Sequence, residues 1–418
     1  MLFRLLGFLL LFITMISCQT KPEEIIQLEN RPLHSVESEV PSEINSDVPS
    51  ILEQPLTPII SPEESWLSQT LSEMSEAQLV GQMMFLSLRQ WSSPEENKVY
   101  HRGMGDYLKD LQPGGVILFQ ENISTFEGVS TLISKWQEQM LVPLLISVDE
   151  EGGLVSRLKS LSPRVPVLPS FSTVSKWDYS TILQKSEALG ASLKELGVHM
   201  NLAPVADLSL ISGGPLGSRS PGAQPQAAAK VVSQVILGLQ NQGVSAVIKH
   251  FPGLGATTID THDSLPTLGV DLLTFQQREA IPFKAGIDQK VDGIMIGHVR
   301  VPHITGDFKP APMSSLLIQG ILRDQWNYQG LIITDALEMG GINDGLSPEE
   351  VIPAVIEAGV DVLLMPTDPY KTRDILLKAL KEGKLSRKRL ETSVRRILEL
   401  KIVRIEKMKK LFTQKRTL

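Results

Sequence analysis

The chain has 418 residues, enough for one large domain or two smaller ones, and its hydrophobic content of 42% is that of a globular protein with a substantial core. The formal net charge is −7, so the composition lacks the basic footprint that nucleic-acid-binding proteins carry. We therefore expect no nucleic-acid partner.

The first eighteen residues have the features of an export signal. Arg4 gives a short basic region, and residues 5–16 form an apolar run that is too short to span a bilayer comfortably. The one cysteine of the chain, Cys18, follows in M-I-S-C, which resembles a bacterial lipobox. We expect residues 1–18 to be a lipoprotein signal peptide and the exported protein to be anchored in a membrane through lipid on Cys18. The alternatives are an uncleaved anchor or a chance cysteine.

Residues 19–63 differ in composition from the rest of the chain. They are rich in proline, glutamate and serine and poor in aromatic residues. Such a segment buries too little apolar surface to offset the entropy lost on ordering. We expect a disordered acidic tether here, followed by one folded domain over residues 64–412.

Short apolar runs alternate with amphipathic stretches through this domain. The eight apolar runs are residues 82–88, 115–119, 144–148, 200–203, 246–248, 293–296, 331–334 and 362–365. The helix-like stretches include residues 178–196, 224–239, 275–289 and 348–358, and residues 386–411 are expected to form basic helices with a solvated charged face. The alternation predicts an α/β fold, a single (β/α)8 TIM-type barrel, with an open doubly wound sheet as the alternative.

Ionisable residues stand at the ends of five of these apolar runs. They are Asp149, Asp207, Lys249 with His250, His298 and Asp335. Because the carboxyl ends of barrel strands meet at one mouth, we expect these side chains to gather around one pocket. Asp207 is equally well explained as a helix cap or a satisfied core group.

Asp335 is the sharpest single position, since it ends the strand-like sequence I-I-T-D. An unpaired carboxylate buried there would cost several kcal/mol. A carboxylate kept ionised by cationic and hydrogen-bonding neighbours can instead act as a nucleophile. The competing interpretation is the N-cap of the next helix.

Asp260 and His262 are two positions apart in D-T-H, so both side chains lie on one side of an extended loop. The carboxylate can then orient the imidazole for acid/base chemistry. Metal ligation by His250, His262 and His298 is the competing interpretation. The chain has no H-E-x-x-H helix, Walker loop or dinucleotide fingerprint in context, and we expect neither a metal nor a cofactor.

Four motifs together resemble glycoside hydrolase family 3, and more narrowly its single-domain β-N-acetylhexosaminidases of NagZ type. They are D-E-E-G-G-L-V-S-R, K-H-F-P-G-L-G, D-T-H and I-T-D-A-L-E-M, and the resemblance covers roughly residues 65–400. It implies a retaining mechanism in which Asp335 is the nucleophile and His262, paired with Asp260, is the acid/base. It also implies five sugar-binding residues: Asp149, Arg157, Arg219, Lys249 and His250.

The substrate implied by the resemblance is a saccharide with terminal β-linked N-acetylglucosamine, derived from peptidoglycan. The alternatives are another β-glycosidase or a glycoside phosphorylase of the same family, a catalytically weak sugar-binding lipoprotein, and a metal hydrolase. Three residues depart from the family pattern: Leu254 replaces a histidine, Leu154 an arginine and Pro221 a phenylalanine. Leu254 is expected to lie in the glycine hinge of the loop that carries the His–Asp pair.

Overall fold

The computed structural model describes residues 62–91, 93–214, 216–257, 265–339, 342, 345–405 and 408. Three residues with an expected role, Cys18, Asp260 and His262, lie outside these ranges.

The described residues form alternating strands and helices. The strands are β1 (Met84–Ser87), β2 (Gly115–Leu118), β3 (Leu145–Val148), β4 (Glu150–Gly152), β5 (Val155–Ser156), β6 (Met200–Asn201), β7 (Ser245–Phe251), β8 (Gly293–Ile296), β9 (Leu331–Thr334) and β10 (Leu363–Leu364). The α-helices are α1 (Pro62–Glu73), α2 (Glu76–Gln82), α3 (Arg102–Leu111), α4 (Phe126–Glu138), α5 (Phe171–Val174), α6 (Tyr179–Leu196), α7 (Pro225–Asn241), α8 (Leu272–Gln277), α9 (Ala280–Asp288), α10 (Pro302–Thr305), α11 (Pro348–Ala358), α12 (Pro369–Lys381) and α13 (Arg387–Arg404). The 3-10 turns are η1 (Glu96–Lys98), η2 (Gln120–Asn122), η3 (Lys159–Leu161), η4 (Gly217–Arg219), η5 (Ala311–Met313) and η7 (Leu337–Met339), and η6 (Leu316–Gln325) is a π-helix.

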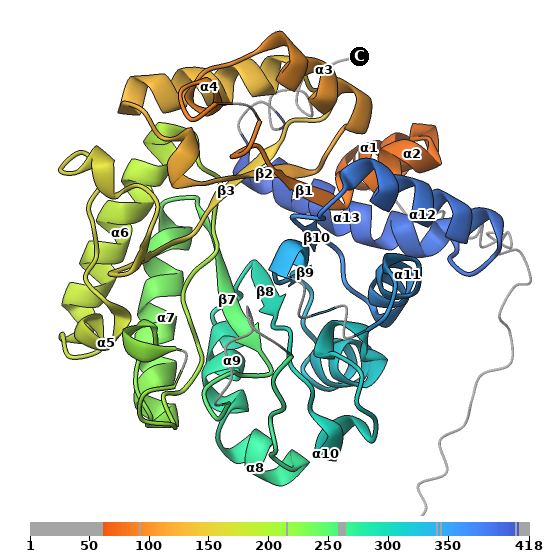
Figure 1. Cartoon of the computed structure of the whole chain (residues 1–418). Coiled ribbons are helices and arrows are strands. Elements are labelled where there is room, and N and C mark those ends of the chain that lie inside the picture. Colours follow the sequence, from red (N-terminus) through yellow and green to blue (C-terminus); the bar gives the residue numbers. More distant parts are fainter. Residues whose placement is uncertain are drawn as a thin grey trace, which may run out of the picture. The chain divides into compact units, whose positions relative to one another are not determined.

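Eight of the strands form one parallel sheet in the order β10-β1-β2-β3-β6-β7-β8-β9. A parallel bridge between Ile333 and Val362 joins the two outer strands and closes the ring. Figure 1 shows these strands at the centre with the helices around them. The predicted (β/α)8 barrel is confirmed, and each of the eight apolar runs contributes one strand.

The barrel core follows from strands that are apolar on both faces. The residues of β2, β3, β8 and β9 are all buried, as expected for parallel strands covered by helices. The helices outside the barrel also pack closely on each other. A Cβ added at Gly238 of α7 would lie 2.4 Å from the Cβ of Ser186 in α6, so this glycine lets the two helices approach.

The helix expected over residues 275–289 is two helices, α8 and α9. Pro282 is the physical reason, because a proline ring clashes with the carbonyl four residues earlier and removes one hydrogen-bond donor. That carbonyl belongs to Arg278, whose backbone leaves the helical region with φ −134° and ψ −80°.

The expectation of a solvated basic face on the last helix is wrong for several of its cations. In α13, Arg389 donates to the carbonyls of Ile356 and Val360, and Arg396 donates to the buried Asp361. Lys401 is fully buried and donates to Gln82 at the end of α2. These side chains attach α13 to the barrel, which the charge pattern alone does not reveal.

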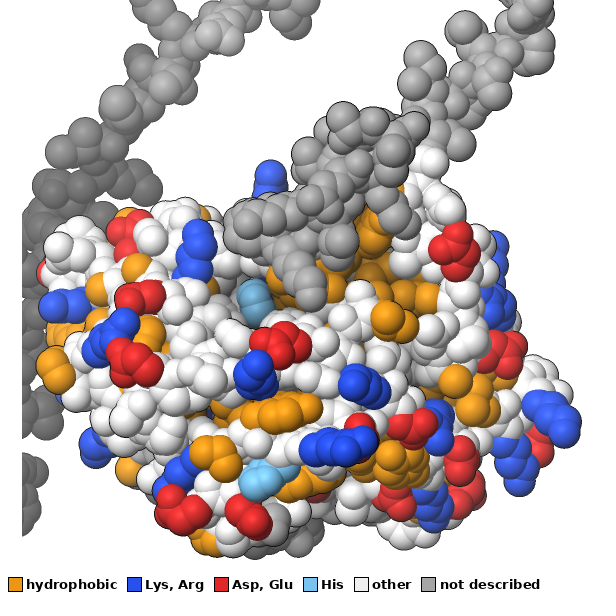
Figure 2. Space-filling model, turned by 90° about the horizontal axis from the view of Figure 1, so that it is seen from above, with side chains coloured by type: hydrophobic (Ala, Val, Ile, Leu, Met, Phe, Trp, Pro, Cys, Tyr) orange, Lys and Arg blue, Asp and Glu red, His pale blue; other side chains and the backbone are white. Residues whose placement is uncertain are grey.

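A short antiparallel hairpin, β4–β5, follows β3 directly and was not expected from the sequence. Gly152, at the end of β4, and Gly153, in the turn, are both at positive φ, and Leu154, the other turn residue, is exposed. In Figure 2, acidic and basic side chains are interspersed over the face shown. Within the described residues, no helix has the length and apolar character needed to cross a bilayer.

Candidate active site

A cavity of about 490 Å³ is lined by residues from the carboxyl ends of the barrel strands, within the size range of small-molecule sites. Every described residue that was expected to bind sugar or act as nucleophile lines it. These residues are Asp149, Arg157, Arg219, Lys249, His250 and Asp335. Asp207 and His298, the other two strand-end residues, are buried and do not line the cavity.

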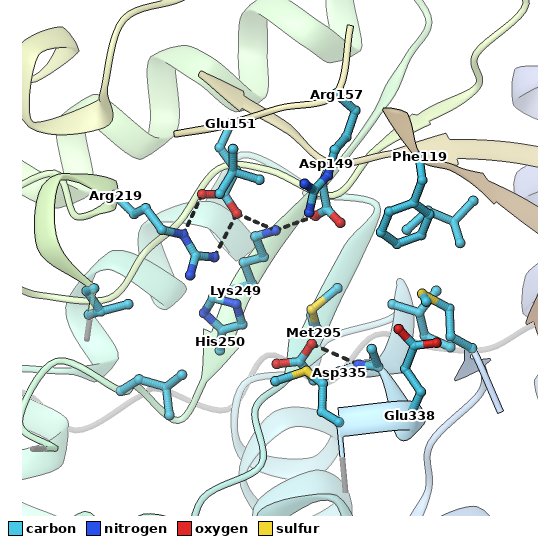
Figure 3. Close-up of a pocket in the computed structure, with 18 of the residues that line it drawn as sticks. Phe119, Asp149, Glu151, Arg157, Arg219, Lys249, His250, Met295, Asp335 and Glu338 are labelled. Atoms are coloured by element: carbon cyan, nitrogen blue, oxygen red, sulfur yellow. Dashed lines mark hydrogen bonds and ion pairs between the residues drawn. The ribbon is translucent and has the colours of Figure 1, made fainter. Parts of the chain in front are cut away.

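Four charged side chains form a closed network at one end of the cavity (Figure 3). Lys249, from β7, contacts Asp149 Oδ1 and Glu151 Oε1, each at 2.6 Å from its Nζ. Arg219, from η4, donates two hydrogen bonds of 2.8 Å to the carboxylate of Glu151. These contacts hold together three segments at the barrel mouth: the segment after β3, η4 and the end of β7.

The network fixes the ionisation of its members. Burial alone would raise the pKa of Glu151, but Lys249 and Arg219 lower it to about 2. Burial would likewise lower the pKa of Lys249, but Asp149 and Glu151 raise it. Lys249 and Glu151 therefore remain charged and paired, and the network presents hydrogen-bonding groups to a polar, uncharged ligand.

His250 is held by the buried Asp207, which follows β6. Its Nδ1 lies 2.7 Å from Asp207 Oδ2 and must be the donor, because a carboxylate only accepts. Its backbone N–H donates to the same oxygen at 3.2 Å, and the other carboxylate oxygen accepts from the N–H of Leu254 at 2.8 Å. Asp207 thus positions the imidazole that faces the cavity and also holds the turn that follows it.

Asp335 lies at the end of β9, opposite the charged network in Figure 3. Its Oδ1 accepts from the N–H of Ala336 at 2.8 Å. Burial raises the pKa of this carboxyl, but His250, His298, Ala336 and Lys249 together hold it below its ordinary value. The carboxylate is therefore ionised at neutral pH and faces the cavity, which is the state that a nucleophile requires.

The remaining wall combines an aromatic ring with two arginines. The guanidinium of Arg89 lies 4.0 Å from the ring centre of Phe119, and that of Arg157 lies 5.3 Å from it. Arg89 is also paired with Glu338, three residues after Asp335. The Nε of Arg157 is buried without a hydrogen-bond partner among the described residues.

The turn after β7, where a hinge is expected around Leu254, packs closely against its surroundings. The Leu254 side chain is buried in the core and lines the cavity, and its carbonyl accepts from the Thr257 hydroxyl at 2.7 Å. Gly253 has φ +121°. A Cβ at Gly255 would lie 1.4 Å from the carbonyl oxygen of Leu208. Leu254 and Thr257 of this turn form part of the cavity wall.

Some cavity residues were not identified as site residues from the sequence. Glu151 makes the most contacts of them. It could have been identified from the sequence, because it lies two residues after Asp149 and residues two apart in an extended segment point to the same side. Arg89, Phe119 and Glu338 come from different segments, and no local sequence pattern predicts that they line the cavity. Among the described residues, no group of three His, Cys, Asp or Glu side chains is arranged to hold a metal.

The barrel with ionisable residues at its strand ends defines the general class of (β/α)8 enzymes. The sequence profile of the glycosyl hydrolase family 3 N terminal domain matches residues 78–400. The chain belongs to glycosyl hydrolase family 3.

Three relatives illustrate the similarity. Beta-hexosaminidase A of Pseudoalteromonas piscicida is 27% identical over 365 residues, which are 78% of this chain and 61% of that protein. Beta-hexosaminidase of Nitrosomonas eutropha is 32% identical over 267 residues, which are 63% of this chain and 76% of that protein. The structure of a family 3 β-N-acetylglucosaminidase from Paenibacillus sp. str. FPU-7 superimposes with a TM-score of 0.73 and 32% identity, covering 79% of this chain and 63% of that one. This chain spans less than two thirds of the first and third of these proteins.

Proposed function

We propose that this protein is an exported, retaining exo-β-N-acetylglucosaminidase that removes terminal N-acetylglucosamine from peptidoglycan fragments. The observation that carries the proposal is the ionised, buried Asp335 facing a network of paired charges suited to sugar hydroxyls. The names of two relatives that are 32% identical, a beta-hexosaminidase and a β-N-acetylglucosaminidase, support the choice of sugar.

In the proposed mechanism, Asp335 attacks the anomeric carbon while His262 protonates the leaving oxygen. The glycosyl–Asp335 ester then reacts with water, from which His262 accepts a proton, and Asp260 orients the imidazole throughout. The other carboxylates that line the described cavity are paired with cations: Asp149 and Glu151 with Lys249, and Glu338 with Arg89. An ion-paired carboxylate such as Glu151, with its pKa near 2, is a poor proton donor at neutral pH. This supports an acid/base supplied by the loop after residue 257.

An assay with aryl β-N-acetylglucosaminides tests the proposal. Asp335→Ala should lower kcat about a thousand-fold or more, because the covalent step is lost. Added azide should restore turnover and give the α-glycosyl azide, which identifies Asp335 as the nucleophile. An Asp335→Ala protein with the wild-type rate would end the assignment.

The acid/base is tested by comparing His262→Ala with Glu338→Gln. His262→Ala should slow substrates with poor leaving groups far more than activated aryl glycosides, because only poor leaving groups need full protonation. Glu338→Gln should leave that selectivity unchanged. The opposite pattern would move the acid/base role to Glu338. Paired reactions on β-glucosides, and with inorganic phosphate added, separate the proposed activity from β-glucosidase and phosphorylase activity.

We also propose that the mature protein is attached to a membrane through acylated Cys18, on the basis of the signal-like residues 1–18. Cys18→Ser should move the protein from the membrane fraction of producing cells to the soluble fraction. A wild-type protein found wholly in the soluble fraction would contradict the anchor.

A further inference from the structure

Glu150 is a buried carboxylate that the proposed mechanism does not use. Its two neighbours, Asp149 and Glu151, line the cavity of the candidate active site. Successive side chains of an extended segment point to opposite sides, and Glu150 does not line the cavity, although it is only 2% exposed. Its carboxylate is therefore directed into the protein on the other side of β4.

The Glu150 carboxylate accepts a backbone hydrogen bond from the segment after β5. Its Oε2 lies 2.9 Å from the N of Leu158, a residue that is fully buried. The peptide unit between Arg157 and Leu158 is planar and includes the Cα of Arg157, so this bond restrains the direction in which the Arg157 side chain leaves the backbone. Figure 3 shows that side chain extending toward Asp149, and Arg157 lines the cavity.

The backbone of Glu150 is itself held by β6. The Asn201 side chain accepts from the Glu150 N–H at 3.0 Å and donates to the Glu150 carbonyl at 2.9 Å. Asn201 is 1% exposed, so both bonds are shielded from water, where hydrogen bonds are electrostatically stronger. A continuous chain of hydrogen bonds thus runs from the barrel wall through Glu150 to the peptide unit of Arg157 and Leu158.

The pairing of the β4–β5 hairpin is too short to hold Arg157 by itself. β5 has two residues, both only partly buried, and the register shifts between Glu150 and Gly152. Even longer two-stranded hairpins are marginally stable on their own. The carboxylate also carries a cost, because Glu150 Oε1 is buried without a hydrogen-bond partner among the described residues. Local costs of this kind are typical of functional sites.

We propose that Glu150 is a positioning residue, which orients Arg157 for sugar binding by accepting from the N–H of Leu158. This inference rests on the proposed function and on the expected contact between Arg157 and the sugar. Without the acceptor, the Leu158 N–H is buried and unpaired, and the segment must shift to satisfy it. The loss should appear in KM, because Arg157 is expected to bind the sugar in the ground state and the transition state alike.

A double-mutant cycle on the full chain tests the inference. The four proteins are wild type, Glu150→Met, Arg157→Ala and the double variant, assayed on an aryl β-N-acetylglucosaminide. Glu150→Met keeps the size of the side chain and removes the acceptor, and it should raise KM about ten-fold with kcat changed less than about three-fold. The double variant should be no worse than Arg157→Ala, because Glu150 acts through Arg157. Effects that multiply in the double variant would overturn the inference.

Three further variants separate the hydrogen bond from packing. Glu150→Gln keeps an oxygen that accepts from Leu158 and should hold KM within about three-fold of wild type. Glu150→Asp withdraws the acceptor by one methylene group, so it should raise KM as Glu150→Met does, and it takes the place of that variant in the cycle if Glu150→Met does not fold. Glu138→Met, at a side chain that is 55% exposed on α4, should leave KM and kcat unchanged. Equal KM values in Glu150→Gln and Glu150→Asp would overturn the inference.

The same assay distinguishes failure of the inference from failure of the proposed function. A wild-type protein that does not hydrolyse the substrate would overturn the proposed function, and the inference with it. An active wild type combined with a wild-type KM in Arg157→Ala would overturn the inference alone, because Arg157 would then not bind the sugar.

Discussion

Asp207 illustrates how a residue that never meets the ligand can control the site. Its carboxylate accepts from His250 and from the N–H of Leu254, and its carbonyl accepts from the hydroxyl of Ser220, next to Arg219. The carboxylate therefore holds the end of β7 and the turn after it, and the backbone carbonyl of the same residue holds the segment next to Arg219. The helix-cap interpretation does not apply, because none of these partners is the first turn of a helix that Asp207 begins.

Asp207→Asn should lower kcat/KM on an aryl β-N-acetylglucosaminide about 10- to 100-fold. The asparagine presents one donor where two acceptors are needed, so either His250 or Leu254 loses its partner. Asp178→Asn is the matched control, because Asp178 caps α6 and asparagine caps helices as well as aspartate does. Wild-type kinetics in Asp207→Asn would show that the aspartate only fills space.

The sequence predicted that the ionisable residues at strand ends share one pocket. The structure brings Asp149, Lys249, His250 and Asp335 together around the cavity, whereas Asp207 and His298 are buried and do not line it. Asp335, Lys249 and His250 could be found because a buried strand has no other use for a terminal charge. Arg89 and Glu338 could not, since their pairing joins positions 249 residues apart and depends on how the barrel closes. The roles of Asp260 and His262 stay predictions.

Among the elements, the turn between β7 and residue 257 is the one on which the site depends most. Glycine is required at Gly255 because the neighbouring backbone leaves no room for a side chain. A Cβ at Gly255 would lie 1.4 Å from the carbonyl oxygen of Leu208, and the Gly255 carbonyl accepts from the N–H of Leu210 at 3.2 Å. A side chain here must push the turn away from the segment after β6.

Gly255→Ala should lower kcat/KM about 100-fold, because a displacement near 1 Å at a catalytic site costs about that much. Thermal unfolding measured in parallel should show a smaller effect, since the rest of the barrel is not altered. Gly269→Ala is the control, as a Cβ at that glycine meets nothing within 4 Å. Equal activity of the two variants would show that the turn tolerates movement.

The sequence predicted the barrel elements well where periodicity was strong, and β8, β9 and α11 have the expected bounds. The β4–β5 hairpin was missed because its strands are too short for any periodic signal. The break between α8 and α9 was missed, although a proline at position 282, inside the expected helix, is a sequence signal for such a break. The inward-bonding arginines of α13 were missed because an amphipathic pattern does not show where a long polar side chain finds its partner.

For the whole molecule, the network around Glu151 makes stability in acid depend on the candidate active site. The ordinary pKa of 4.5 and the value of about 2 in the folded chain differ by an amount worth about 3 kcal/mol. Because the folded pKa is depressed, this stabilisation is present above pH 4.5 and is lost as the pH falls toward 2.

Glu151→Gln should therefore lower the free energy of unfolding at pH 7 by about 3 kcal/mol, and the difference from wild type should narrow as the pH is lowered from 5 to 3. Urea unfolding at a series of pH values measures this. Glu138→Gln, on the surface of α4 with its side chain 55% exposed, should change stability little at any pH. A difference that does not vary with pH would show that packing, not charge, accounts for the loss.

The balanced charges of this network also constrain how the enzyme can change. Removing the charge of Glu151 leaves Arg219 without its carboxylate, and removing that of Lys249 leaves Asp149 without its cation, which is strongly destabilising. Replacing a cation and its carboxylate together removes that penalty. New sugar specificities at this end of the cavity should therefore be reached through paired substitutions, and libraries that vary one position at a time should yield mostly unstable proteins.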